Sequence, residues 1–415
     1  MSESGKARQG RLRIAWISDV GPGGGVPGMA TLLVAALSAQ DCELVVFSRT
    51  PRQDIDRLFS GQVLERTSFF VSSYQWEWGK WYSRDRRVAF IASFIKRIRA
   101  GRKLVSDLVI EHARRPFDVV VQFSQIELFG LRKSATRLPL VLYPCVHADG
   151  ERQACIREES IARKCEPWWW RSFRSFYLEL RSWMQARDMR LVRKIIGMSN
   201  VFNQTVKQDY RLADAKFGVV YQPIRLDRIS ALKRQADGQI RLLFVGRISV
   251  RKGIELIIAA APQILAKHPD VLITIIGAGS LWSNYEPLLD HSLPERLLWK
   301  RSLPHDEVIK EMENSDILLV PSHYEPGGIV VGEALAAGML IVASDVVGSA
   351  EVLGDETCLK FPAGDLSKFL VAIEGAIDRI RTNAGEVRRA ARSECEKHFN
   401  PSLVANALLG HLRTL

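Results

Sequence analysis

The sequence predicts an α/β protein with two doubly wound domains that face each other across a cleft. The chain has 415 residues, and because single hydrophobic cores rarely grow beyond roughly 250–300 residues, two domains are expected. Short apolar segments rich in Val, Ile and Leu alternate with helical segments in both halves. Such alternation is typical of parallel sheets that carry helices on both faces.

Each half repeats the same succession of strands and helices. In the N-terminal half, strands are predicted at residues 13–18, 43–48, 118–123, 138–146 and 194–198. In the C-terminal half, strands are predicted at residues 241–245, 271–276, 317–320 and 340–343. Helices are predicted there at residues 254–267, 306–314 and 331–337. Strands separated by helices in this way form a parallel sheet.

The boundary between the domains is expected near Pro223, because a polar stretch follows a strand-like segment there. The N-terminal domain would then span residues 11–222 and the C-terminal domain residues 223–398. The last segment, residues 399–415, is predicted to be a helix, because it carries four leucines at helical spacing. They are Leu403, Leu408, Leu409 and Leu412.

No part of the chain reaches the roughly 20 consecutive apolar residues that a membrane-spanning helix needs. The polar and basic residues 1–13 do not resemble a signal peptide either. We therefore expect a cytoplasmic protein. The six cysteines include no CxxC pair, so free thiols are expected rather than disulfides or a zinc site.

The positive charge is confined to the N-terminal half. Residues 1–222 carry 36 Lys and Arg against 22 Asp and Glu, whereas residues 223–415 carry 22 against 24. Two segments of this half, residues 74–103 and 167–194, interleave aromatic with basic side chains. Each segment is either a helix on an anionic membrane surface or a helix with an aromatic core face and solvated arginines. Contact of this basic, Trp-rich domain with the cytoplasmic membrane face is expected. Nucleic-acid binding is not expected, because no nucleic-acid-binding motif accompanies the positive charge.

The first chemical motif is the loop 244–253, FVGRISVRKG, which follows a predicted strand and precedes a predicted helix. Ligands of open α/β sheets bind outside the carboxyl ends of the strands, and a helix N-terminus there favours an anion. Arg247 and Lys252 add two positive charges, and Gly246 lets the backbone approach closely. The loop fits a diphosphate, although a basic solvated turn would have the same composition.

The second motif is the stretch 322–334, SHYEPGGIVVGEA, in which seven residues separate Glu325 from Glu333. Gly327 and Gly328 can present backbone N–H groups, and the carboxylates can accept hydrogen bonds from sugar hydroxyls. Glu333 has a plainer explanation as a carboxylate near a helix N-terminus, whereas Glu325 stands in a turn where no helix needs it. The stretch therefore supplies the hydrogen-bond partners that a nucleotide sugar requires.

Together the two motifs resemble the retaining glycosyltransferases of family four, the glycosyl transferases group 1, which have the GT-B fold. The resemblance covers residues 240–359 and includes Gly277-x-Gly279, a Leu303-Pro304 turn and an Ala-Ala-Gly sequence at 336–338. It implies two Rossmann-like domains and a last helix that crosses back to the N-terminal domain. It also implies transfer of a hexose-type sugar from a UDP- or GDP-sugar to an acceptor hydroxyl of a glycan or lipid-linked acceptor.

The resemblance also implies roles for single residues. Arg247 and Lys252 would bind the donor diphosphate, Glu325 the donor sugar and Glu333 the ribose, while His147 would approach the sugar from the other domain. The candidate catalytic residues are Glu325, His147, Arg247 and Lys252. The candidate donor-binding residues are Gly24, Gly25, Gly246, Arg247, Lys252, Arg301, Leu303, Glu325, Gly327, Gly328, Ile329 and Glu333.

Three features depart from the family pattern. The family commonly has an aromatic residue where this chain has Gly327, and the interdomain Asn-Gly-x-Asp pattern is QPIRLD at residues 222–227. The N-terminal loop has Val26 and Pro27 where an acidic residue often follows its glycines. None of these departures removes a phosphate ligand. Because Arg247, Lys252 and a helix N-terminus can neutralise a departing diphosphate, no metal ion or other cofactor is expected. The alternatives are a sugar phosphorylase of the same fold and a non-catalytic nucleotide-sugar or membrane-binding module.

Overall fold

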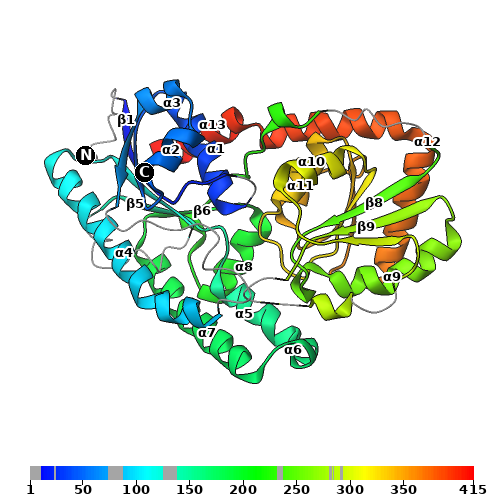
Figure 1. Cartoon of the computed structure of the whole chain (residues 1–415). Coiled ribbons are helices and arrows are strands. Elements are labelled where there is room, and N and C mark those ends of the chain that lie inside the picture. The colour runs from blue at the N-terminus through cyan, green and yellow to red at the C-terminus, as the bar shows by residue number, and fades with distance from the viewer. Residues whose placement is uncertain are drawn as a thin grey trace.

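The computed structural model describes residues 11–22, 25–72, 87–124, 138–230, 237–279, 283, 285–289 and 293–415, with the backbone alone for residues 87–97. Two parallel sheets, one from each half of the chain, form the centres of two domains (Figure 1). The α/β fold class predicted from the alternation of strands and helices is thereby confirmed. Most of the Trp-rich segment 74–103 lies outside the residues whose side chains are described.

The N-terminal sheet has seven strands in the order β3-β2-β1-β4-β5-β6-β7. All its strand pairs are parallel, and Ile14 of β1 pairs with Leu44 of β2 and with Val119 of β4. The strands are β1 (Leu12–Ile17), β2 (Cys42–Ser48), β3 (Thr67–Val71), β4 (Val119–Phe123), β5 (Leu140–Tyr143), β6 (Lys194–Gly197) and β7 (Phe217–Val219).

Helices cover both faces of this sheet. Trp16 and Leu33 belong to the apolar cluster on one face, and Phe47 and Leu108 belong to the cluster on the other. The helices are α1 (Val26–Ser38), α2 (Arg52–Leu58), α3 (Gly61–Arg66), α4 (Arg87–Arg114), α5 (Ala148–Arg157), α6 (Glu159–Cys165), α7 (Trp168–Leu191) and α8 (Asn200–Tyr210).

The C-terminal sheet has six parallel strands in the order β10-β9-β8-β11-β12-β13. These are β8 (Ile240–Val245), β9 (Val271–Ile276), β10 (Leu297–Lys300), β11 (Ile317–Val320), β12 (Leu340–Ser344) and β13 (Cys358–Phe361). Its helices are α9 (Ile254–Lys267), α10 (His305–Glu313), α11 (Ile329–Ala336) and α12 (Leu366–Phe399). The central strands β8 and β11 stand side by side, so the loops that follow them open at the same edge of the sheet.

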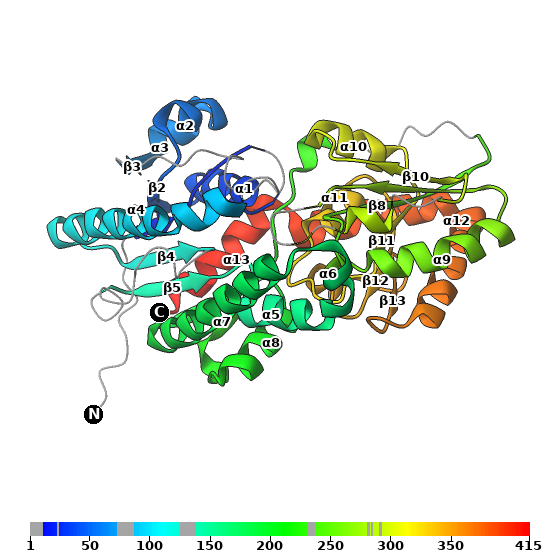
Figure 2. The same ribbon diagram turned by 60° about the horizontal axis from the view of Figure 1, so that its bottom comes forward.

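The end of the chain returns to the N-terminal domain (Figures 1 and 2). After α12, helix α13 (Pro401–Arg413) lies against α1. Val404 and Leu408 of α13 are buried in the same apolar cluster as Trp16. The C-terminal leucine pattern thus forms a helix as predicted, and its apolar side completes the core of the domain at the other end of the chain.

A second connection runs in the opposite direction, from the N-terminal domain into the C-terminal domain. Ala162 of α6 is fully buried and belongs to the apolar cluster of α9 and α12. Beside it, the hydroxyl of Tyr285 donates a 3.0 Å hydrogen bond to Glu158. Within the residues that the structure describes, no helix is long and apolar enough to cross a membrane. All six cysteines are free, as predicted.

Candidate active site

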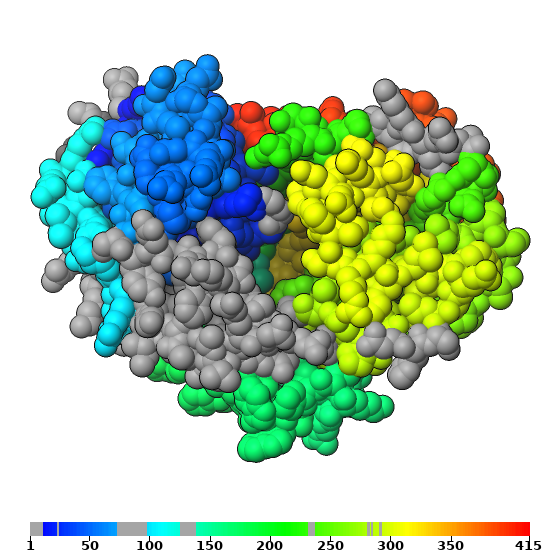
Figure 3. Space-filling model, viewed as in Figure 1, coloured from blue at the N-terminus to red at the C-terminus, as the bar shows by residue number. Residues whose placement is uncertain are grey.

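The candidate site lies between the two domains, at the carboxyl ends of their central strands. Figure 3 shows a hollow there, with residues of both domains on its sides. A pocket at this boundary is lined by Glu151 and Arg174 of the N-terminal domain and by Arg247 and Arg251 of the C-terminal domain. Parallel sheets place ligand sites at such edges, because the loops after neighbouring strands converge.

Lys252 and Glu325, predicted from separate motifs, are in direct contact. The Nζ atom of Lys252 forms an ion pair with the Glu325 carboxylate, and both side chains are mostly buried. Burial alone would raise the pKa of Glu325, but Lys252 and Arg251 reverse the effect and hold that pKa below its usual range. Burial lowers the pKa of Lys252 against the opposing attraction of Glu325. A buried charge pair of this kind holds both partners in fixed positions.

The loop after β8 places the rest of the first motif beside this pair. Arg247 is exposed and lines the pocket between the domains. Gly253, which caps α9, has a φ angle of 74°. A Cβ atom at Gly253 would lie 1.9 Å from the carbonyl oxygen of Pro321. This glycine therefore lets the loop after β8 lie directly on the segment that leads to Glu325.

The glycine turn after Glu325 leads into helix α11. Gly328 has a φ angle of 98° and caps the helix, which begins at Ile329. The backbone carbonyl of Glu325 accepts a 2.9 Å hydrogen bond from the Gly348 N–H. The Gly327 carbonyl accepts a 2.7 Å hydrogen bond from the Ser349 N–H. These contacts fix the turn whose N–H groups the second motif assigns to the donor.

Two of the departures from the family pattern meet in space. A Cβ atom at Gly327 would lie 2.4 Å from the Nε2 atom of Gln222. Gln222 belongs to the segment that joins the domains and is itself buried. Its amide thus occupies the space that a side chain at position 327 would need. Sequence reasoning noted each departure but gave no sign that the two are coupled.

The residues assigned to the ribose and base lie further along the same domain. Glu333 of α11 is buried, and its Oε1 atom lies 3.4 Å from Nε2 of His305. Arg301 is largely exposed and pairs with Glu286 at 2.8 Å. Leu303 packs against the apolar cluster around α11. Leu303 therefore reaches the α11 region directly, while Arg301 contacts Glu286.

Burial raises the pKa of Glu333 from 4.5 to about 8. This pKa is higher in the folded chain than in the unfolded chain. The protonated Glu333 carboxyl therefore makes its full contribution to stability below about pH 4.5. That contribution is lost as the pH rises through about 8. We therefore compare the free energy of unfolding of Glu333→Gln with that of wild type at two pH values. The difference should favour the variant by about 2–5 kcal/mol more at pH 9 than at pH 5. Urea unfolding at both pH values measures this, with the exposed Glu356→Gln as control. Parallel pH profiles for wild type and Glu333→Gln would contradict it.

The glycine-rich loop before α1 is only partly described. Gly24 lies outside the described residues, whereas Gly25 caps α1 with a φ angle of 82°. A Cβ atom at Gly25 would meet nothing within 4 Å. Gly25 is thus needed for its backbone conformation rather than for space, and its predicted contact with the donor stays a prediction.

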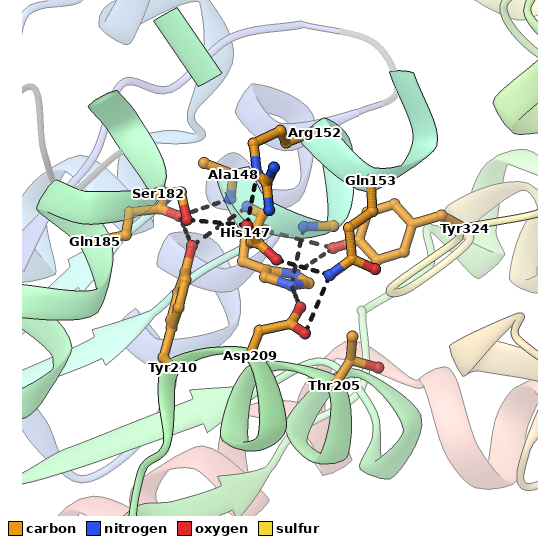
Figure 4. Close-up of polar contacts among 12 residues, drawn as sticks. His147, Ala148, Arg152, Gln153, Ser182, Gln185, Thr205, Asp209, Tyr210 and Tyr324 are labelled. Atoms are coloured by element: carbon orange, nitrogen blue, oxygen red, sulfur yellow. Dashed lines mark hydrogen bonds and ion pairs between the residues drawn. The ribbon is translucent and has the colours of Figure 1, made fainter. Parts of the chain in front are cut away.

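His147 follows β5 and caps helix α5. Its ring is fully buried, with Nδ1 2.6 Å from the Tyr324 hydroxyl and Nε2 2.7 Å from Oδ2 of Asp209 (Figure 4). His147 therefore reaches the second motif of the other domain through Tyr324, the residue before Glu325. Direct contact with a donor sugar stays a prediction.

Sequence reasoning missed several residues that complete the site. Tyr324 stood inside the second motif, next to Glu325, so its position was available as a signal. Arg251 donates a 2.9 Å hydrogen bond to the carbonyl of Tyr324 and stood inside the first motif. Asp209 and Glu151 had no local signal, because α8 and α5 reach the site only through the fold of the N-terminal domain.

No group of three or more acidic, His or Cys side chains that could hold a metal ion occurs among the described residues. The expectation of no metal ion overlooked an Asp-x-Asp sequence in the chain, Asp54-Ile55-Asp56, which lies on α2. Asp56 pairs there with Arg52 at 2.9 Å, and Asp54 lies 3.9 Å from Arg57. These aspartates thus have basic partners on their own helix, in the N-terminal domain.

Two facing domains with parallel sheets, a last helix that returns to the first domain and a site between them define the GT-B fold. The family model of the glycosyl transferases group 1 matches residues 227–378. The C-terminal domain is therefore similar to this family, as the motifs predicted.

Curated relatives and solved structures are both similar to this chain. Glycogen synthase of Mycobacterium tuberculosis is 32% identical over 182 residues, which are 43% of each chain. The phosphatidylinositol N-acetylglucosaminyltransferase GPI3 subunit of Saccharomyces cerevisiae is 29% identical over 37% of this chain and 34% of its own. The crystal structure of Anabaena HepE with UDP and glucose has a TM-score of 0.60 at 15% identity, over 97% of this chain and all of that one. The chain thus spans less than half the length of these curated relatives and shares its whole fold with the solved structure.

Proposed function

We propose that the protein is a retaining glycosyltransferase that moves a hexose-type sugar from a nucleotide-diphosphate sugar to an acceptor hydroxyl. The buried pair of Lys252 and Glu325, at the edge of the cleft between the domains, carries this proposal. A donor that enters the cleft meets Lys252 at its diphosphate and Glu325 at its sugar. Arg247 stands exposed on the same side and adds a second charge for the diphosphate.

The chemistry proposed for this site is the neutralisation of the departing diphosphate. Arg247 and Lys252 stabilise the negative charge that develops on the leaving group, which is the largest single contribution in many transfer reactions. The leaving phosphate itself then accepts the proton of the attacking hydroxyl, on the face from which it departs. We therefore propose transfer with retention and without a metal ion.

A thermal-shift and product-release panel of UDP-, GDP- and ADP-sugars, each with a chelator, tests the proposal. We expect stabilisation and nucleoside diphosphate release with one nucleotide family, and we name UDP first because the solved relative was crystallised with it. A donor response that needs added metal would contradict the metal-free proposal. No response to any nucleotide would contradict the donor site as a whole.

The acceptor we propose is a lipid-linked or other membrane-surface molecule. The yeast relative carries a lipid, phosphatidylinositol, in its name. Helix α7 supports this acceptor class in the present chain, because its two sides differ. Trp170 and Tyr177 are buried against each other and Leu178, whereas Trp168, Phe176 and Trp183 are 72%, 66% and 60% exposed. One side of α7 is thus core, and the other presents large aromatic groups among arginines to solvent.

We expect the chain to bind vesicles of equal parts phosphatidylglycerol and phosphatidylcholine at low salt and to leave them at high salt. Basic residues contribute about 1 kcal/mol each at an anionic surface, and exposed aromatic side chains insert at the interface. The triple substitution Trp168→Ser, Phe176→Ser and Trp183→Ser should weaken binding by about tenfold or more. Leu298→Ser, an exposed apolar position of the other domain, is the matched control. Equal binding by the triple variant and the control would contradict the role of α7.

A further inference from the structure

We propose that Asp209, His147 and Tyr324 form a hydrogen-bond chain through which the N-terminal domain positions Glu325. His147 is then a positioning residue that acts through Tyr324, rather than a group that touches the donor. This inference rests on the proposed function, since Glu325 is taken there as the sugar ligand. Asp209 and His147 belong to the N-terminal domain and Tyr324 to the C-terminal domain, so these hydrogen bonds cross the boundary between the domains (Figure 4).

The first step is that the ring of His147 has no free edge. It is fully buried, and the rings of Phe202, Tyr210 and Tyr324 stand edge-on around it at centroid distances of 5.8, 5.6 and 5.5 Å. Both nitrogens face protein atoms, at 2.6 and 2.7 Å. A donor sugar could contact this ring only after one of these bonds had broken.

The second step concerns the direction of the hydrogen bonds. Burial raises the pKa of Tyr324 well above its usual value, so the phenol keeps its proton. In the proposed arrangement the hydroxyl donates to Nδ1, so the single N–H proton of the neutral ring is on Nε2, where it faces the carboxylate of Asp209. The other carboxylate oxygen accepts a 3.2 Å hydrogen bond from Gln153. The Gly150 N–H lies 3.1 Å from the same nitrogen and can donate to it only in the other tautomer, whereas the shorter 2.7 Å distance to Asp209 favours a proton on Nε2.

The third step is that three side chains anchor Tyr324 and Glu325, in addition to the Gly348 N–H that bonds the Glu325 carbonyl. The Tyr324 side chain is held by His147, and its carbonyl oxygen by Arg251 at 2.9 Å. The Glu325 carboxylate is held by Lys252. Two of these anchors belong to the C-terminal domain and are present whatever the other domain does. Of these three, the bond to His147 depends on the two domains being together, as does the 2.8 Å hydrogen bond from the Ser199 hydroxyl to the carbonyl of the next residue, Pro326.

Binding of the nucleoside diphosphate and binding of the sugar should therefore depend on different contacts. Nucleoside diphosphate binding needs Arg247 and Lys252, which belong to the C-terminal domain alone. Recognition of the sugar needs Glu325, whose position also depends on the His147 contact across the boundary. Loss of the Tyr324 hydroxyl should therefore weaken binding of the sugar and lower transfer, while binding of the nucleoside diphosphate stays as it is.

The test is a double-mutant cycle of Tyr324→Phe and His147→Gln, with UDP and UDP-glucose as probes and the GDP pair next. Titration calorimetry gives the affinity of the nucleotide sugar divided by that of the nucleoside diphosphate, and initial rates give kcat. We expect Tyr324→Phe to lower both the ratio and kcat about tenfold, the size of one well-made hydrogen bond. His147→Gln should add nothing in the Tyr324→Phe background, because a positioning residue acts only through its partner.

Tyr210→Phe is the matched control, because this tyrosine also packs against the His147 ring but bonds Gln185 within its own domain. It should keep the wild-type ratio. Should either cycle variant fail to fold, Asp209→Asn takes its place under the same criterion. Independent, multiplying losses from His147→Gln and Tyr324→Phe would overturn the inference, as would a wild-type ratio in Tyr324→Phe. A wild-type chain that binds no nucleoside diphosphate would overturn the proposed function instead.

Discussion

Lys252→Ala should lower the rate of sugar transfer by roughly 100-fold or more, the scale seen when a group that stabilises transition-state charge is removed. The variant loses a positive charge for the departing diphosphate. It also leaves Glu325 buried without the ion pair that fixes it. Glu325→Gln should have an effect of the same order, because it removes the other half of the pair. Initial rates of nucleoside diphosphate release with the preferred donor measure both variants.

Lys267→Ala is the matched control for this prediction. Lys267 stands at the other end of α9 and pairs with Glu374 at the exposed surface. Exposed ion pairs contribute about 0–1 kcal/mol, and we expect wild-type rates from this variant. Near-normal turnover in both Lys252→Ala and Glu325→Gln would show that the paired charges do not serve the reaction.

Gly253→Ala should destabilise the C-terminal domain by more than about 3 kcal/mol, beyond the usual range of single substitutions. The residue has a positive φ angle, which costs an alanine about 1 kcal/mol or more. Its new Cβ atom would also lie 1.9 Å from the backbone oxygen of Pro321. Backbone cannot rotate away as a side chain can, so either α9 or the segment before Glu325 must move. The midpoint of urea unfolding reports this loss.

Gly410→Ala is a control in which the same substitution should change stability in the opposite direction. Gly410 is an exposed glycine inside α13, and a Cβ atom there would meet nothing within 4 Å. Alanine is favoured over glycine inside helices by about 1 kcal/mol, so this variant should be slightly more stable than wild type. Equal unfolding midpoints for Gly253→Ala and wild type would mean that the loop after β8 adapts without strain.

The strands that the sequence predicted are those at the centres of the two sheets. They are buried on both faces and appear as continuous apolar runs. The strands that were missed, β3, β10 and β13, all lie at sheet edges. In β3, buried Thr67 alternates with more exposed residues, and β10 ends in half-buried Trp299 and Lys300. An edge strand has fewer buried positions, so its apolar pattern is too short to recognise.

The site residues that the sequence predicted also differ from those it missed. Lys252 and Glu325 were predicted because each stands in a local motif, and parallel strands bring the ends of neighbouring motifs together. Their direct contact, however, is a property of the folded domain. Asp209 was missed because it contacts His147 across 62 residues of chain, and nothing in the sequence of α8 distinguishes it. Helix α7 was predicted with two alternative roles. Its buried aromatic side is part of the core, while membrane contact through its exposed side stays a prediction.

The contact between Gln222 and Gly327 makes the two positions interdependent. A side chain at position 327 would occupy the place of the Gln222 amide, so the glutamine can keep its present position only beside a glycine. Because the amide is the flexible end of its side chain, an aromatic residue at 327 requires the glutamine to change its rotamer. An engineer who wishes to place an aromatic residue at 327 should therefore shorten position 222 in the same variant.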